Sequence, residues 1–150
     1  MNLKNLLVRK GFVKIKLKKI NTNHFEIKAT VNDVKGRFIL DTGASNSCVD
    51  ISLAKNFNLE VEDSETKAAG AGAIDMETKI SSKNTLKLKD WQFNSCTLVL
   101  LDLTHVNTAL TTHDAKAVHG IIGADILEKG NAIIDYKKKC VYLKKIVYKF

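Results

Sequence analysis

The sequence predicts an all-β fold with one or two short helices. Most of its apolar segments are short, and several alternate with polar residues at a period of two, as strands with one solvated face do. Residues that favour turns separate these segments. The clearest helical spacing covers only residues 105–115, where we expect Thr104 to cap a helix.

The first strands are expected to form a hairpin that ends at Asp41. Residues 12–20 alternate and predict one strand, and residues 25–31 predict the next. Residues 32–36 combine Asn, Asp and Gly and predict a turn, so residues 37–40 form a strand that runs directly into Asp41. Further short strands are expected at residues 48–51, 86–88, 96–101, 118–122, 132–135 and 141–150, with a helical turn at residues 52–57.

The totals predict a single domain that spans residues 1–150. This length suits one ordinary domain, and the apolar fraction of 45% can fill one core. The chain has no proline and no Gly/Ser-rich linker that would mark a boundary. The apolar run at residues 6–8 is too short for a signal peptide, and nothing approaches the length of a membrane span. We therefore expect a cytoplasmic protein with no membrane partner.

The net charge of +8 comes almost entirely from lysine. Much of it lies in alternating runs such as residues 14–18, which predict solvated strand faces on which lysine also discourages edge-to-edge aggregation. An anionic partner is the alternative explanation. A nucleic-acid partner is not expected, because the chain has no recognisable binding motif and no aromatic residues interleaved with the basic ones.

The three cysteines are expected to be buried thiols. Cys48, Cys96 and Cys140 are odd in number and widely spaced, which predicts neither a disulfide framework nor a zinc site. The histidines do not form a metal-binding pattern either. The sequence therefore predicts no bound metal.

Residues 38–47 contain the candidate catalytic carboxylate. An apolar strand delivers Asp41 into a loop of small residues, and peptide hydrolysis by paired carboxylates needs such a loop. Gly43 and Ala44 leave room for a substrate backbone, and the Thr42 hydroxyl can hold the loop rigid. An Asp-Thr-Gly triplet alone is a weak signal, because ordinary turns also contain it.

Three segments in order resemble the retropepsin family of single-domain aspartic peptidases. Residues 39–45 read as an apolar pair followed by Asp-Thr-Gly-Ala-Ser, residues 69–73 are rich in glycine, and residues 121–127 pair two isoleucines with a glycine and a short helix. The likeness extends from about residue 25 to residue 143. It implies a closed barrel, peptide or protein substrates, an Asp dyad assembled across a homodimer, and no metal or organic cofactor.

The same resemblance assigns residues to roles. A second copy of the chain must supply the other aspartate, because this chain has only one loop of the catalytic type. Residues 70–73 would form a flap over bound peptide, with an ordinary flexible loop as the alternative. Asp125 is expected to be a structural acid at the short helix. The implied catalytic residues are Asp41, Thr42 and Gly43, and the implied substrate-binding residues are Ala44, Ser45, Gly70, Ala71, Gly72 and Ala73.

Two departures from the retroviral pattern stand out. Retroviral members carry an arginine after the second glycine motif, paired with an acid just beyond the catalytic loop, whereas this chain has Ala124 and Ser45 at those positions. We therefore expect no such ion pair and a different dimer geometry near the site. The segment of residues 101–119 is longer than its counterpart in the viral pattern. In this respect the chain resembles the cellular and bacterial relatives more closely than the viral enzymes.

Three functions remain open from the sequence. The first is an aspartic endopeptidase. The second is a catalytically silent retropepsin-like domain that dimerises or binds peptides. The third is a basic scaffold for nucleic acid. Intact Asp41, Thr42 and Gly43 favour the first.

Overall fold

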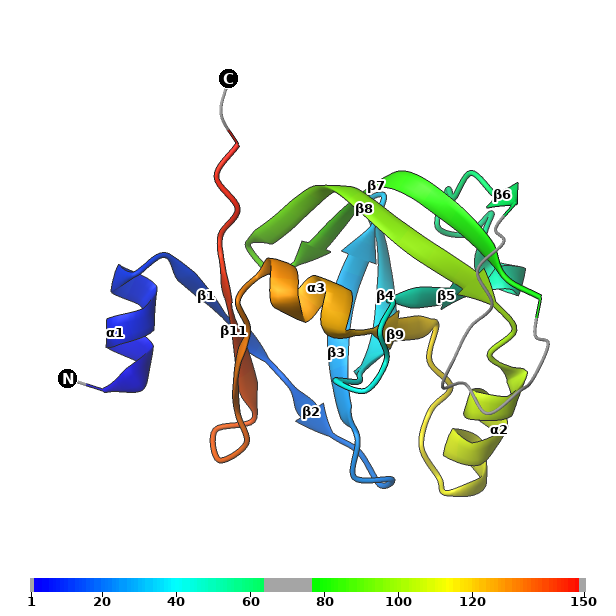
Figure 1. The fold of residues 1–150 in the computed structure, drawn as a ribbon. Helices are drawn as coiled ribbons and strands as arrows, with labels where there is room; N and C mark the ends of the chain where they lie inside the picture. The colour runs from blue at the N-terminus through cyan, green and yellow to red at the C-terminus, as the bar shows by residue number, and fades with distance from the viewer. Residues whose placement is uncertain (1, 64–76, 149–150) are drawn as a thin grey trace.

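The computed structural model describes residues 2–63 and 77–148, and its strands form two sheets (Figure 1). The smaller sheet has the strand order β1-β11-β10, and the larger has the order β2-β3-β4-β9-β5-β8-β7-β6. The strands are β1 (Phe12–Lys16), β2 (Lys18–Lys19), β3 (Phe25–Val31), β4 (Val34–Leu40), β5 (Cys48–Asp50), β6 (Glu62–Asp63), β7 (Lys79–Leu88), β8 (Trp91–Leu101), β9 (Gly120–Ile122), β10 (Ile133–Asp135) and β11 (Cys140–Lys144). The helices are α1 (Leu3–Arg9), α2 (Thr104–Thr112), α3 (Ala124–Lys129) and the 3₁₀ helix η1 (Ile51–Leu53).

The larger sheet closes on itself. Strand β3 pairs with β4 along its whole length, and its end also pairs with β7 through Thr30–Lys87 and Val31–Leu86. This second pairing completes a ring in the order β3-β4-β9-β5-β8-β7. A closed ring leaves no free edge within the barrel. The expectation of an all-β closed barrel with few helices is confirmed.

The hairpin that leads to Asp41 forms with a tighter turn than the sequence predicts. Asn32 and Asp33 alone make the turn, with φ angles of 48° and 68° that these residue types tolerate better than most. Val34 already begins β4, and Gly36 lies inside that strand, not in the turn. Strand pairing therefore overrides the turn preference of glycine at this position.

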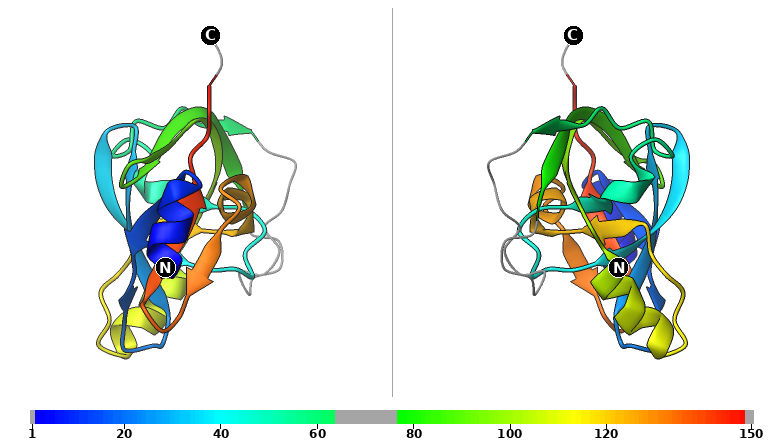
Figure 2. Two further views of the ribbon diagram at one scale, coloured as in Figure 1. Left: turned by 90° about the vertical axis from the view of Figure 1, so that its left-hand side faces the viewer. Right: turned by 90° about the vertical axis from the view of Figure 1, so that its right-hand side faces the viewer.

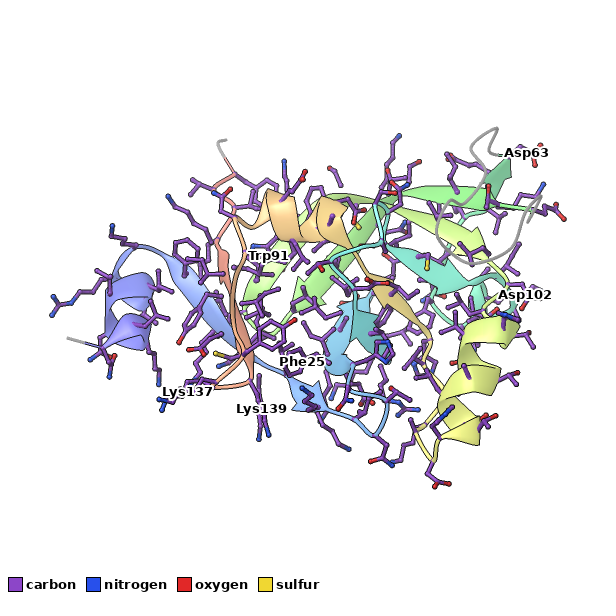
Figure 3. All side chains as sticks on the ribbon, turned by 60° about the horizontal axis from the view of Figure 1, so that its bottom comes forward. Phe25, Asp63, Trp91, Asp102, Lys137 and Lys139 are labelled. Atoms are coloured by element: carbon purple, nitrogen blue, oxygen red, sulfur yellow. The ribbon has the colours of Figure 1, made fainter. Side chains whose placement is uncertain are left out.

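The two sheets share one core. Val141 and Leu143 of β11 are fully buried in the same apolar cluster as the barrel residues. Trp91 of β8 is also fully buried, and its indole Nε1 donates a hydrogen bond of 2.8 Å to the Lys144 carbonyl at the end of β11 (Figure 3). This indole bond satisfies a buried polar group and joins the barrel to the smaller sheet.

The helices α1 and α2 lie at opposite ends of the molecule (Figures 1 and 2). The sequence pattern does not predict α1, which has only seven residues and buries only Leu7, against Cys140 and Tyr142. The predicted cap of α2 is wrong. Thr104 is the first residue of that helix, and the Asp102 carboxylate accepts its backbone N–H at 2.8 Å.

In the described part of the chain, no helix has both the length and the apolar character needed to cross a membrane.

Candidate active site

Parallel pairing of β4 and β9 creates the candidate site. The last pair in their register is Leu40 with Ile122, so the two strands end side by side. Asp41 follows Leu40, and its backbone N–H donates to the Ile122 carbonyl at 2.9 Å. Because parallel strands point the same way, the Asp41 loop and the segment that begins at Gly123 emerge next to each other.

The Asp41 side chain sits at the mouth of a tight turn and is exposed. The Gly43 backbone N–H donates to Asp41 Oδ1 at 2.9 Å, and the Ala44 N–H donates to the Asp41 carbonyl at 3.2 Å. A Cβ added to Gly43 would lie 3.3 Å from Oδ1, a tight but open position. The turn therefore fixes one carboxylate oxygen while the group remains accessible from solvent.

The far side of the turn rests directly on the start of α3. The Ala124 N–H donates to the Ala44 carbonyl at 2.7 Å. A Cβ on Gly123 would lie 2.5 Å from the Ala44 carbonyl oxygen, closer than any real contact of that kind. Only glycine at position 123 permits this approach of the two backbones.

Ser47 and Asp125 add a polar clamp. The Ser47 N–H donates to both Asp125 carboxylate oxygens at 3.0 Å, and the Ser47 hydroxyl donates to Oδ1 at 2.7 Å. The same hydroxyl oxygen accepts the Gly123 N–H at 2.8 Å. Ser47 is fully buried, so this network satisfies groups that would be costly to leave unpaired.

The clamp confirms that Asp125 is a structural acid and shows what the sequence misses. Ala124 and Ser45, the residues at the positions of the retroviral ion pair, carry no charge. Asp125 and Ser47 instead link the Asp41 loop to α3. Nothing local identifies Ser47, because its partner lies 78 residues away and only the β4–β9 pairing brings the two together.

Thr42 faces an open groove. Its side chain is exposed, and within residues 2–63 and 77–148 its hydroxyl has no hydrogen-bond partner. The groove has a volume of about 540 Å³ and continues along α3 toward β10. Its other lining residues are Ala124, Leu127, Glu128, Asn131, Ala132 and Ile134.

Beside this groove, β10 is an edge strand of the smaller sheet, whereas β11 lies between β1 and β10. Ile133 of β10 is an exposed apolar side chain. An edge strand of this kind offers unpaired backbone groups to another chain.

Cys48 lies next to the clamp but is not a nucleophile. The pKa of its thiol is raised to about 12, chiefly by burial and also by the nearby carboxylates of Asp125, Asp41 and Asp50. A neutral thiol is a poor nucleophile and a poor metal ligand. All three cysteines are buried and free, as predicted. The described residues also contain no group of three acidic, histidine or cysteine side chains that could hold a metal.

The structure brings five predicted site residues into one loop and does not describe the others. Asp41, Thr42, Gly43, Ala44 and Ser45 are consecutive in the turn after β4. The predicted flap residues Gly70, Ala71, Gly72 and Ala73 lie outside the described residues.

A protein-family profile described as "Aspartyl protease" matches residues 27–126, a segment that contains both the Asp41 loop and the Gly123 segment. The chain belongs to the aspartyl protease family. A comparison with curated protein sequences finds no significant match.

Solved structures share the fold at low sequence identity. A retropepsin-like aspartic protease from Rickettsia conorii aligns with a TM-score of 0.60 and 20% identity, over 92% of this chain and 94% of that one. EIAV protease, in complex with the inhibitor HBY-793, aligns with a TM-score of 0.55 and 20% identity, over 73% of this chain and 90% of that one. The retroviral protease-like domain of Ddi1 from Leishmania major aligns with a TM-score of 0.55 and 19% identity, over 81% of this chain and 88% of that one. The fold of this family member is therefore retropepsin-like.

Proposed function

We propose that this protein is an aspartic endopeptidase that acts as a homodimer, with Asp41 from each copy forming the catalytic dyad. The observation that carries the proposal is the Asp41 carboxylate itself. It is exposed, it is oriented by Gly43, and it sits on a loop clamped to α3, in a chain of the aspartyl protease family.

The chemistry requires two carboxylates and one water. In the singly protonated dyad, one carboxylate takes a proton from the water that attacks the scissile carbonyl, while the protonated partner polarises that carbonyl. Gly43 and Ala44 leave room for the substrate backbone beside the dyad, and Ser45 follows on the same exposed turn. The proposed mechanism needs no metal or organic cofactor.

Two features support assembly with a second copy. Thr42 lines a groove and its hydroxyl has no partner in the described chain, so a partner loop can supply one. The β10 edge next to that groove can extend its sheet across a two-fold axis. Strand β11 is less suited to this role, because it already has a neighbour on each side.

We also propose that residues 1–150 act as one domain, since both sheets contribute to a shared core. The flap role of Gly70, Ala71, Gly72 and Ala73 remains a prediction from the sequence. A hairpin lid at this position would exclude water from the dyad once peptide is bound.

The test compares wild type with Asp41→Asn and Asp33→Asn on a peptide library read by mass spectrometry. Asp33 is exposed in the β3–β4 turn and makes a matched acid-to-amide control. We expect cleavage by wild type and the control, and a loss of at least about 10³-fold in Asp41→Asn. Equal turnover by all three would refute the assignment, and no cleavage by a wild-type dimer would favour a silent binding domain.

A further inference from the structure

Six exposed lysines gather where the first strands meet the turn between β10 and β11. We call them the basic surface. Two backbone contacts unite its parts, since Lys16 lies opposite Cys140 in the β1–β11 register and the Leu17 N–H donates to the Lys139 carbonyl at 2.9 Å. Lys137 and Lys139 project outward from the turn (Figure 3). The members of the basic surface are Lys16, Lys18, Lys19, Lys137, Lys138 and Lys139.

The charge of this surface is not neutralised from within. None of its six ammonium groups takes part in an ion pair among the described residues. Two carboxylates are close in sequence or register, but neither forms an ion pair with one of these ammonium groups. Glu26 is nearly buried and lies 3.9 Å from the Arg37 guanidinium, while Asp135 accepts the backbone N–H of Lys138 at 2.9 Å. A positive potential therefore faces solvent here.

An aromatic pair lies among these cations. The Tyr136 side chain is 68% exposed, and its ring centroid lies 5.2 Å from that of Phe25. The Lys19 ammonium lies 5.5 Å from the centre of the Phe25 ring. The surface therefore combines charge with an exposed apolar contact, which a peptide can use and a simple ion cannot.

The basic surface begins close to the catalytic loop. Lys19 pairs with Phe25 and Phe25 pairs with Leu40, so the three lie in line across β2, β3 and β4. With neighbouring strands about 4.8 Å apart, the Lys19 backbone lies roughly 10 Å from the strand that delivers Asp41. A segment bound on this surface could thus extend toward the Asp41 loop.

We propose that the basic surface binds acidic polypeptide segments and holds them next to the Asp41 loop, so that proteins carrying such segments are the preferred substrates. This inference rests on the proposed peptidase function for its choice of a polypeptide partner. Two copies of the surface would repel each other, so a two-fold contact of this surface with itself is disfavoured. The lysine-rich strand face that the sequence predicts to be solvated would thus also bind substrates.

The binding test uses the Asp41→Asn chain, so that no probe is cleaved. Fluorescence anisotropy at low salt would measure the affinity for a fluorescein-labelled poly-glutamate peptide of about 20 residues. The variant Lys137→Gln/Lys138→Gln/Lys139→Gln removes three charges from the surface. The matched control, Lys35→Gln/Lys55→Gln/Lys87→Gln, removes three exposed charges distant from it. Each folded state is verified by thermal melting.

We expect the surface variant to bind about tenfold more weakly and the control to remain within about twofold of the parent. Equal affinities in the two variants would overturn the proposal. So would tighter binding of a single-stranded oligothymidine of equal charge, or of vesicles containing phosphatidylserine, because the partner would then belong to another class.

A second measurement separates this proposal from the peptidase function. Active chains are given two peptides with the same cleaved sequence, one of which carries a glutamate tail, and kcat/KM is compared. Asp41-dependent cleavage with no preference for the tail would overturn the substrate class alone. Poly-glutamate binding that is lost in the surface variant, together with no cleavage of any peptide, would refute the peptidase function and leave the binding surface standing.

Discussion

The two sides of the turn that follows β4 differ in how they are held. The side formed by Ala44 and Ser47 rests on α3 through backbone contacts and the Asp125 carboxylate. The side formed by Asp41, Thr42 and Gly43 is exposed, and its hydroxyl has no partner in the described chain. Contacts within one chain thus suffice to position the Asp41 carboxylate. They leave the Thr42 hydroxyl beside it without a hydrogen-bond partner among the described residues. This contrast predicts that mutations on the two sides will affect different properties.

Among changes on the two sides of this turn, the largest effect on stability should come from Gly123→Ala. Its φ of −108° suits alanine, so the cost is steric and arises from the Ala44 carbonyl oxygen 2.5 Å from the new Cβ. We expect a loss of about 3 kcal/mol in the free energy of unfolding, measured by urea denaturation. Gly43→Ala is the matched change on the open side and should cost less than about 1 kcal/mol. Similar losses in both variants would erase the contrast.

Asp125→Ala should cost somewhat less, about 2 kcal/mol, because the buried Ser47 loses its acceptor. Asp125→Asn should recover part of this loss, since its amide oxygen can still accept one of the Ser47 bonds. Chemical denaturation of the three proteins would give the order. An alanine variant as stable as wild type would mean that backbone contacts alone hold the loop.

On the open side, Thr42→Val keeps the shape of the side chain and removes the hydroxyl. We expect unchanged monomer stability and a dimer dissociation constant raised about fivefold, the equivalent of one hydrogen bond of about 1 kcal/mol. Thr42→Ser should restore dimerisation. Sedimentation at several concentrations measures both, and an unchanged dissociation constant for the valine variant would place the partner contact elsewhere.

The smallest expected effect is on the pH dependence of stability, through His119 and its contact with Arg37 of β4. Burial lowers the pKa of His119 below 6.5, the Arg37 charge lowers it further, and His119 Nδ1 accepts the Arg37 N–H at 2.8 Å. The unfolded chain therefore binds a proton more readily than the folded one. Stability should be full above about pH 6.5 and should fall as the pH drops through the folded pKa. His119→Gln should show a shallower decline between pH 7.5 and 5.5 in urea titrations, and an equal slope would assign the effect to another group.

The sequence predicts best where one segment carries its own signal. The alternation of residues 25–31 matches β3, and the apolar run into Asp41 correctly predicts where the loop begins. Strand β7 is longer than the expected residues 86–88. The sequence pattern misses its first part because Ser81 and Asn84 are buried polar residues that break the alternation. Asn84 Nδ2 donates to the Ser81 carbonyl within β7 and to the Cys96 carbonyl of β8, and the second of these acceptors comes from the neighbouring strand.

The register of β4 with β9 also has a consequence for biosynthesis. A chain that ends at residue 119 contains the complete Asp41 loop but lacks the strand and helix against which the loop is held. Contacts so distant in sequence form late, after most of the chain has left the ribosome. Under the proposed function, a nascent chain would remain without hydrolytic capacity until β9 and α3 had been made, so its own neighbours on the polysome would be protected from premature cleavage.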